Sequence, residues 1–185
     1  MPKVLPITTY GRDILRKVAK PIKDINIDIV NLVDNMFYTM NAAEGIGLAA
    51  PQVNEGISLA IIDISSLDEY KNEKPLVIIN PRIIDTNGQS LVNEGCLSIP
   101  EVRGDVKRPE EILLEYTDLN GKENRREFSG LLARVLQHEI DHLNGKLFID
   151  YLSEEDLEKN KELFKKIKSN KIVTEYPIYN SKSKP

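Results

Sequence analysis

Residues 129–145 read SGLLARVLQHEIDHLNG, and this stretch decides the fold. Its apolar side chains recur at helical intervals, at Leu131, Leu132, Val135, Leu136, Ile140 and Leu143. They cover a wider arc than the apolar stripe of a surface helix, which predicts that this helix is buried. Ser129 is the candidate N-cap, and Asn144 with Gly145 forms the stop signal. We therefore expect a central helix against which the other elements pack.

The segments outside this helix contain two more helices and several short strands. Residues 25–40 have apolar side chains at helical spacing, with Asp24, Asn26 and Asp28 as candidate caps and Gly45 beyond the end. Apolar, β-branched runs broken by turn residues predict strands over residues 57–64, 76–84, 90–92, 112–117 and 125–128. The pair Asn120-Gly121 predicts a hairpin between the last two strands. After Ser153, acidic residues followed by lysines predict a C-terminal helix.

This order of elements predicts an α+β fold. Short antiparallel or mixed strands would surround the buried helix, with one helix near the N-terminus and one near the C-terminus. No linker-like stretch divides the chain, so we expect a single domain over residues 1–172 and a flexible tail over residues 173–185.

Composition and charge exclude several classes of protein. The 185 residues are 41% hydrophobic and carry a net charge of −4, which argues against a disordered chain and against a broad nucleic-acid surface. One cysteine excludes a disulfide scaffold and favours a reducing compartment. No signal peptide or membrane span is visible, so we expect a cytoplasmic protein with neither DNA nor a membrane as partner.

The predicted central helix carries the run His138-Glu139-Ile140-Asp141-His142, which contains both histidines of the chain. Residues i and i+4 share one face of a helix, so both imidazoles can reach one cation. Glu139 then stands close enough to act on a metal-bound water. The alternative is a chance spacing of two surface histidines, which the apolar character of this helix disfavours. The run therefore predicts a hydrolytic metal site.

A catalytic metal site usually takes three protein ligands, and the chain has no third histidine. Downstream carboxylates at Glu154, Glu155, Glu158 and Glu175 are candidates, although Glu158 and its neighbours fit a solvated helix face. Cys96 is the other candidate. A lone cysteine is usually a small buried hydrophobe, but the glycine, serine and proline around this one indicate a tight turn. A divalent cation would also stabilise its thiolate, which makes Cys96, His138 and His142 a candidate ligand set.

Residues 45–52, GIGLAAPQ, form a third unusual segment. They contain a literal G-x-G-x-x-A, but a dinucleotide-binding turn follows a strand and opens a helix, whereas this one follows a helix. Pro51 also disfavours helical geometry at Ala50. Small residues allow the backbone to approach another group closely, and Gln52 would present an amide there. A helix end that leads into a tightly packed edge strand explains the glycines equally well.

Together the three motifs GIGLAAPQ, EGCLS (residues 94–98) and QHEIDH (residues 137–142) resemble the signature motifs of peptide deformylases. The resemblance extends from GRDILRKVAKPI near the N-terminus to GKLFIDYLS after the third motif. The segment after Ser153 is similar to the form of the enzyme that ends in a helix. The resemblance implies removal of the formyl group from the N-terminal formyl-methionine of new proteins, with release of formate.

Residue by residue, the resemblance implies that Cys96, His138 and His142 bind a divalent metal and that Glu139 is the general acid/base. The metal would be ferrous iron in the cell, replaceable by zinc, nickel or cobalt. The partners would be nascent formylated polypeptides, met at the ribosome, and we expect a monomer.

The resemblance also implies that Gln52 and the backbone N–H of Leu97 stabilise the oxyanion, with Gly47 beside the substrate. Leu131 and Val135 lie on or near the face of the helix that carries His138, and they are candidates for the methionine pocket. Ile46, next to Gly47, is a third candidate. A purely core role fits each of the three equally well. Arg134 is too polar for such a wall.

Arg103 follows Cys96 by seven residues and would contact the substrate backbone or form an exposed salt bridge.

Two other functions remain open. One is a metallopeptidase that cleaves internal bonds with the same helix, and the other is a noncatalytic metal-bound interaction module.

Overall fold

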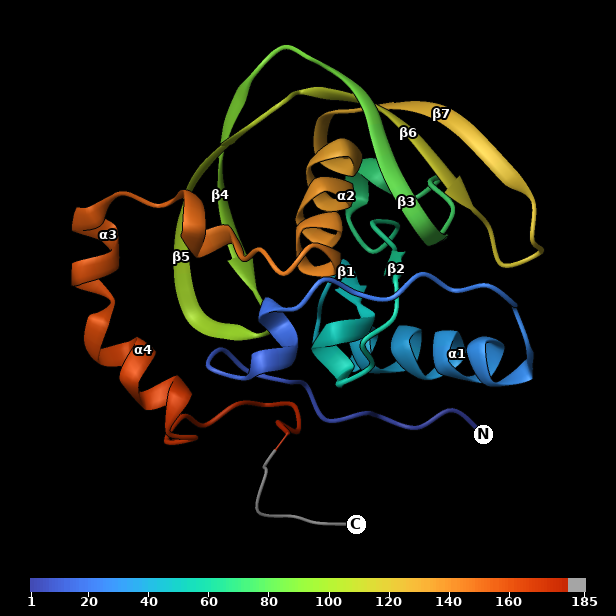
Figure 1. The fold of residues 1–185 in the computed structure, drawn as a ribbon. Helices are drawn as coiled ribbons and strands as arrows, with labels where there is room; N and C mark the ends of the chain where they lie inside the picture. Colours follow the sequence, from blue (N-terminus) through green and yellow to red (C-terminus); the bar gives the residue numbers. More distant parts are fainter. Residues whose placement is uncertain (180–185) are drawn as a thin grey trace.

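The computed structural model describes residues 1–179 and confirms the α+β architecture (Figure 1). Within these residues the strands form a five-stranded antiparallel sheet in the order β1-β2-β3-β6-β7 and a two-stranded sheet, β4-β5. Helix α2 (Gly130–Leu143) stands between the two sheets, as the buried helix on which the fold depends (Figure 1).

The elements have the following bounds. The strands are β1 (Gly47–Ala49), β2 (Leu59–Ile62), β3 (Leu76–Asn87), β4 (Ser90–Cys96), β5 (Ile99–Arg108), β6 (Glu111–Thr117) and β7 (Glu123–Ser129). The other α-helices are α1 (Ile27–Ala42), α3 (Glu154–Lys159) and α4 (Lys161–Lys168). Short 3-10 helices are η1 (Asp13–Arg16), η2 (Ala50–Val53), η3 (Asp68–Tyr70) and η4 (Phe148–Tyr151).

The small sheet is an extension of the large one. Strands β3 and β6 pair in the large sheet, and their continuations β4 and β5 pair in the small sheet. The chain turns between β3 and β4 at Gly88, whose φ of +65° is a conformation that a residue with a Cβ rarely adopts. This turn takes the end of β4, with Cys96, across to the face of α2.

Three clusters of buried side chains hold the elements together. The first packs α2 against the large sheet, including Leu136, Ile140, Ile78 and Leu114. The second packs α1 against β1, β2 and β3, including Met36, Met40, Leu48 and Ile61. The third joins β5 to the C-terminal part of the chain, including Val102, Val106, Phe148 and Ile167. Helix α2 thus belongs to the first cluster, and β4 and β5 belong to the third, so packing holds all three elements in place.

Helix α1 confirms the prediction over residues 25–40 to within two residues. The Asn26 side chain caps it by accepting hydrogen bonds from the N–H groups of Asp28 and Ile29, at 3.0 and 3.1 Å. Its end differs from the expected glycine stop, because Glu44, with a φ of 52°, is the left-handed residue and Gly45 follows it.

The small sheet is where the strand prediction was incomplete. Strand β4 runs on to Cys96, four residues past the predicted end, and β5 was not predicted at all. Alternate residues of β5 are buried from Val102 to Arg108, but Gly104 and Arg108 occupy two of the buried positions. A search for apolar runs misses such a strand because its inward face is not uniformly apolar.

The predicted C-terminal helix is two short helices, α3 and α4, that meet at Asn160. Both the backbone N–H and the side-chain amide of Asn160 donate to the carbonyl oxygen of Asp156, at 3.2 and 2.8 Å. An asparagine side chain that competes for backbone partners in this way favours a helix end. The predicted start is confirmed, because the Ser153 side chain caps α3.

After α4 the chain returns to the N-terminal segment. The N–H of Ile7 donates to the carbonyl oxygen of Pro177, and the N–H of Tyr179 donates to that of Ile7, both at 2.8 Å. Residues 180–185 lie outside the described part, so flexibility of the tail stays a prediction. Among residues 1–179, no helix has both the length and the apolar character that crossing a bilayer requires.

Candidate functional site

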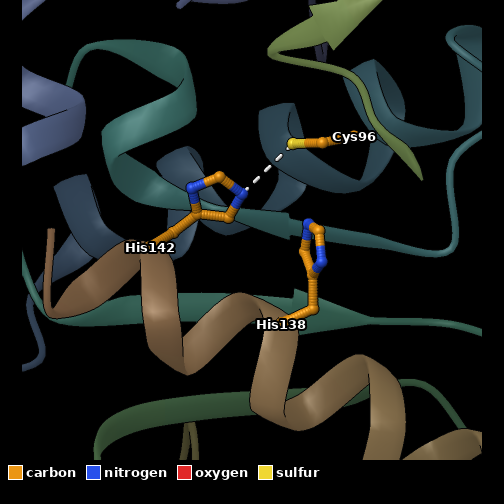
Figure 2. Close-up of side chains that lie close together, drawn as sticks. All are labelled: Cys96, His138 and His142. Atoms are coloured by element: carbon orange, nitrogen blue, oxygen red, sulfur yellow. Dashed lines mark hydrogen bonds between the residues drawn. The ribbon is translucent and has the colours of Figure 1, made fainter. Parts of the chain in front are cut away.

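The structure brings together the three predicted ligands Cys96, His138 and His142. One ligand atom from each lies within 4.8 Å of the other two, and Cys96 Sγ is 3.2 Å from His142 Nε2. Figure 2 shows both imidazoles projecting from neighbouring turns of α2 toward Cys96 on the end of β4. The i, i+4 spacing places the rings on one face, and the small sheet supplies the sulfur.

This donor set fits a divalent metal. A thiol and two imidazoles are ligands that zinc and iron accept. His142 is buried, and burial lowers its pKa well below the ordinary value, which favours the neutral ring that a metal needs. Its Nδ1 has no hydrogen-bond partner among the described residues, which is unusual for a buried polar atom.

Glu94 orients the other histidine. Its Oε2 lies 3.0 Å from His138 Nδ1, so that His138 Nε2 is left for the cluster. Burial raises the pKa of Glu94, but hydrogen bonds from His138 and Arg108 outweigh it and lower the pKa to about 2. In turn, burial lowers the pKa of His138, while the Cys96 sulfur and Glu94 raise it and prevail. Glu94 is therefore a buried carboxylate that stays charged.

Sequence reasoning did not single out Glu94 or Arg108. Arg108 donates from Nε to Glu94 Oε1 at 2.7 Å and from Nη1 to Asp141 Oδ2 at 2.5 Å, and its side chain is 4% exposed. The signal for Glu94 was its place two residues before Cys96, because alternate residues of a strand face the same side. No comparable signal marked Arg108, since β5 itself was missed.

Arg134 lines the same cleft as His138 and Glu139, but as a buried polar residue with fixed partners rather than as an apolar wall residue. It is 5% exposed, and it donates to Glu94 Oε1 at 3.0 Å and to the carbonyl oxygens of Val106 and Ser90 at 3.0 and 2.8 Å. These bonds tie α2 to both strands of the small sheet. Arg134 on α2 thus holds the small sheet, which carries Cys96.

Glu139 is a buried carboxyl group beside the three predicted ligands. Burial raises its pKa to about 7, with His138 lowering it and Glu94 raising it. Its Oε2 has no hydrogen-bond partner within residues 1–179. A carboxyl group in this state can both release and accept a proton near neutral pH.

Gly47 allows Glu139 to occupy this position. A Cβ at Gly47 would lie 2.5 Å from Glu139 Oε1 and 2.8 Å from Val135 Cγ1. Gly47 also begins β1, the edge strand of the large sheet. Both readings of the GIGLAAPQ segment therefore apply, since it is a tightly packed edge strand and a point of close backbone approach.

The Gln52 amide points toward the cluster. Its Oε1 accepts from the N–H of Ala49 at 2.7 Å, which leaves Nε2 directed at Ser98 Oγ, 3.3 Å away, and Cys96 Sγ, 3.5 Å away. Gln52 is 1% exposed, so this orientation is held by packing as well. The structure thus places a donor N–H beside the predicted sulfur ligand.

A cleft of about 690 Å³ opens onto Cys96, His138 and Glu139. Its lining includes the predicted substrate-binding residues Ile46, Gly47, Arg103, Leu131 and Val135, together with Leu97, the predicted oxyanion donor. Ile46, Leu131 and Val135 also pack in the core cluster of α2, so they belong to both wall and core.

Arg103 lies at this cleft and bonds Asn93, with Nε donating to the side-chain oxygen at 2.9 Å and Nη2 to the backbone oxygen at 3.1 Å. The downstream carboxylates do not join the metal-ligand group. Glu155 and Glu158 pair with lysines on the exposed face of α3 and α4, whereas Glu175 lines the cleft.

Comparison with known proteins gives a consistent result. The family model described as polypeptide deformylase matches residues 4–158. The peptide deformylase of Chlorobium luteolum is 48% identical over 175 residues, 95% of this chain and 92% of the relative. A peptide deformylase structure from Legionella pneumophila is 37% identical with a TM-score of 0.83, covering 91% of this chain and 98% of that one. The structure from Synechococcus elongatus in complex with actinonin is 45% identical with a TM-score of 0.80, covering 88% and 87%.

Proposed function

The chain belongs to the peptide deformylase family, and we propose that it is a metal-dependent hydrolase acting on the N-terminal formyl-methionine of newly synthesised polypeptides. It would cleave the formyl C–N bond and release formate. One observation carries this proposal: the ligand atoms of Cys96, His138 and His142 lie within 4.8 Å of one another, and Cys96 and His138 line a cleft that Glu139 also lines.

The three ligands would hold one divalent cation. When bound, such a cation lowers the pKa of a coordinated water from about 16 toward about 7 and polarises a carbonyl group. We propose ferrous iron in the cell, with zinc, nickel or cobalt able to replace it. The support is the sulfur donor of Cys96, because a soft ligand of this kind suits iron and zinc better than a site of oxygen ligands would.

Glu139 would move the proton. With a pKa of about 7 it takes a proton from the attacking water and passes it to the nitrogen of the formyl amide. Protonation of that nitrogen allows the C–N bond to break, so that formate and a free amino terminus result. Burial supports this role because it raises the pKa of Glu139, and within residues 1–179 no hydrogen bond to its Oε2 opposes the effect.

The carbonyl oxygen of the formyl group gains negative charge as its carbon becomes tetrahedral. We propose that Gln52 Nε2 and the backbone N–H of Leu97 donate hydrogen bonds to this oxygen. The support is the direction of the Gln52 amide, which Ala49 holds toward Cys96. Donors held in place before the reaction need no rearrangement as the charge develops.

The methionine side chain would occupy the apolar part of the cleft. Ile46, Leu131 and Val135 would provide its wall, Gly47 would lie beside the substrate backbone, and Arg103 would contact that backbone; the support is that all five residues line the cleft. A cleft of about 690 Å³ suits the first few residues of a chain rather than a folded protein. We propose that the enzyme acts as a monomer on nascent chains at the ribosome, in the cytoplasm.

A formate-release assay tests the proposal. Anaerobically prepared, iron-loaded enzyme should release formate from a formyl-Met peptide and leave the peptide bonds of an acetylated peptide of the same sequence intact. Cleavage of internal bonds instead would indicate a metallopeptidase. Metal binding without turnover of either peptide would indicate a noncatalytic module.

A further inference from the structure

The segment after α4 forms part of the cleft. Residues 173–176 are among the cleft-lining residues, although they lie beyond residues 4–158, which the family model matches. The two backbone hydrogen bonds to Ile7 anchor the chain just after them. Figure 1 shows this last segment returning to lie near the N-terminal part of the chain. These hydrogen bonds hold the segment in place as one wall of the cleft.

Within this segment, alternate side chains face the domain. Thr174 and Tyr176 are half-buried, whereas Val173, Glu175 and Pro177 are exposed. The Tyr176 hydroxyl donates to the backbone oxygen of Leu97 at 2.7 Å, which joins residues 79 positions apart. Thr174 Oγ1 donates to the carbonyl oxygen of Tyr176 at 2.6 Å and so restrains the backbone from which the ring extends.

In the turn between β4 and β5, residues 96–98, three hydrogen bonds from distant segments hold Leu97 and Ser98. The N–H of Tyr10 donates to the carbonyl oxygen of Ser98 at 2.8 Å, and Gln52 Nε2 donates to Ser98 Oγ at 3.3 Å. These two hold Ser98, whereas Tyr176 holds residue 97 itself. The Leu97 carbonyl shares one rigid peptide plane with the Ser98 N–H, and the Leu97 N–H shares the preceding plane with the Cys96 carbonyl. Cys96 is held beside His142, with its Sγ 3.2 Å from Nε2, so a fixed Leu97 carbonyl restricts the two dihedrals between the planes and thereby the direction of the Leu97 N–H.

We infer that Tyr176 is a positioning residue for deformylation: its hydroxyl holds the turn at residues 96–98 so that the Leu97 N–H stays aimed at the formyl oxygen. The inference rests on the proposed function, because it gives the Leu97 N–H its role. Tyr176 itself touches the turn rather than the reacting atoms.

Tyr176→Phe tests the inference, because it removes the donor and keeps the ring. The matched control is Tyr179→Phe on the same segment, whose described contacts to Ile7 and Arg12 use backbone atoms. We expect Tyr176→Phe to lower kcat for a formyl-Met peptide about three- to tenfold, an effect of the order of one hydrogen bond, with KM and bound metal unchanged and Tm lower by no more than about 4 °C. Tyr179→Phe should match the wild type.

Amide hydrogen exchange provides a readout that does not depend on turnover. Exchange at residues 96–98 should be faster in Tyr176→Phe than in the wild type and unchanged in Tyr179→Phe. An unchanged kcat, or a kcat that falls only in proportion to bound metal, would overturn the inference. Wild-type enzyme that releases no formate would instead refute the proposed function, and unchanged exchange at residues 96–98 would refute the anchoring separately.

Discussion

Charged side chains around α2 form ion pairs in the protein interior, whereas those along α3 and α4 form ion pairs on the surface. Around α2, Glu94 and Arg108 form an ion pair at 2.7 Å, and their side chains are only 6% and 4% exposed. Along α3 and α4, an example is the ion pair that Glu155 and Lys159 form at 2.8 Å; their side chains are 78% and 61% exposed. The separations are nearly equal, but water screens the second pair and not the first. The comparison teaches that distance alone does not say what a charge pair does; the environment does.

Loss of the Glu139 carboxylate should have the largest effect in the buried region. Glu139→Gln keeps the size of the side chain but cannot accept and deliver a proton, so kcat should fall by about 10²- to 10⁴-fold. Bound metal, measured by elemental analysis, should be unchanged because Glu139 is not a proposed ligand. A variant that retains most of its kcat would show that Glu139 is not the acid/base.

Loss of a neutral polar group in the same region should have a smaller effect. Gln52→Leu removes the Nε2 donor beside Cys96, and the barrier should rise by about 2.7 to 4 kcal/mol. Steady-state kinetics on a formyl-Met peptide should show the loss in kcat, with metal retained. Turnover equal to that of the wild type would remove Gln52 from the mechanism.

Acid should weaken the buried pairs selectively. The folded pKa of Glu94 is about 2 against an ordinary 4.5, so its contribution to stability is complete above pH 4.5 and is lost as the pH falls toward 2. This shift corresponds to about 3 kcal/mol of unfolding free energy. Urea unfolding at several pH values, with a chelator present so that metal release does not contribute, measures it.

Glu94→Gln is the control for this acid effect. The variant should start less stable at neutral pH, because it leaves Arg134 without a buried counter-charge and leaves Arg108 with Asp141 alone. Its stability should then depend less on pH between 5 and 2. The same pH slope in both proteins would mean that Glu94 is not the group responsible.

The exposed region should respond least. Lys159→Gln removes the pair with Glu155 while keeping similar helix propensity, and unfolding free energy should change by about 0.2 to 1 kcal/mol. The change should shrink further in high salt. A loss as large as that of Glu94→Gln would contradict the contrast between the two regions.

Much of the site was predictable because its signals are local. The spacing of His138 and His142, the small residues around Gly47 and the turn at Cys96 each appear within a few residues of sequence. Glu94, Arg108 and Tyr176 were not identified, because each has its role through partners far along the chain. Strand β5 was missed for a related reason: its buried Arg108 is acceptable only with Glu94 and Asp141 beside it.

The amino-acid sequence alone determined that α2 is a buried helix and that its two imidazoles share one face, because helical periodicity needs only neighbouring residues. The sequence offered Cys96 and several downstream carboxylates as candidates to complete that face, and only the tertiary structure decided between them. Cys96 lies 46 residues before His142, and it reaches the imidazole only because β4 pairs with β5 and Arg134 ties both strands to α2. Such convergence depends on long-range packing and hydrogen bonding, which no local pattern encodes.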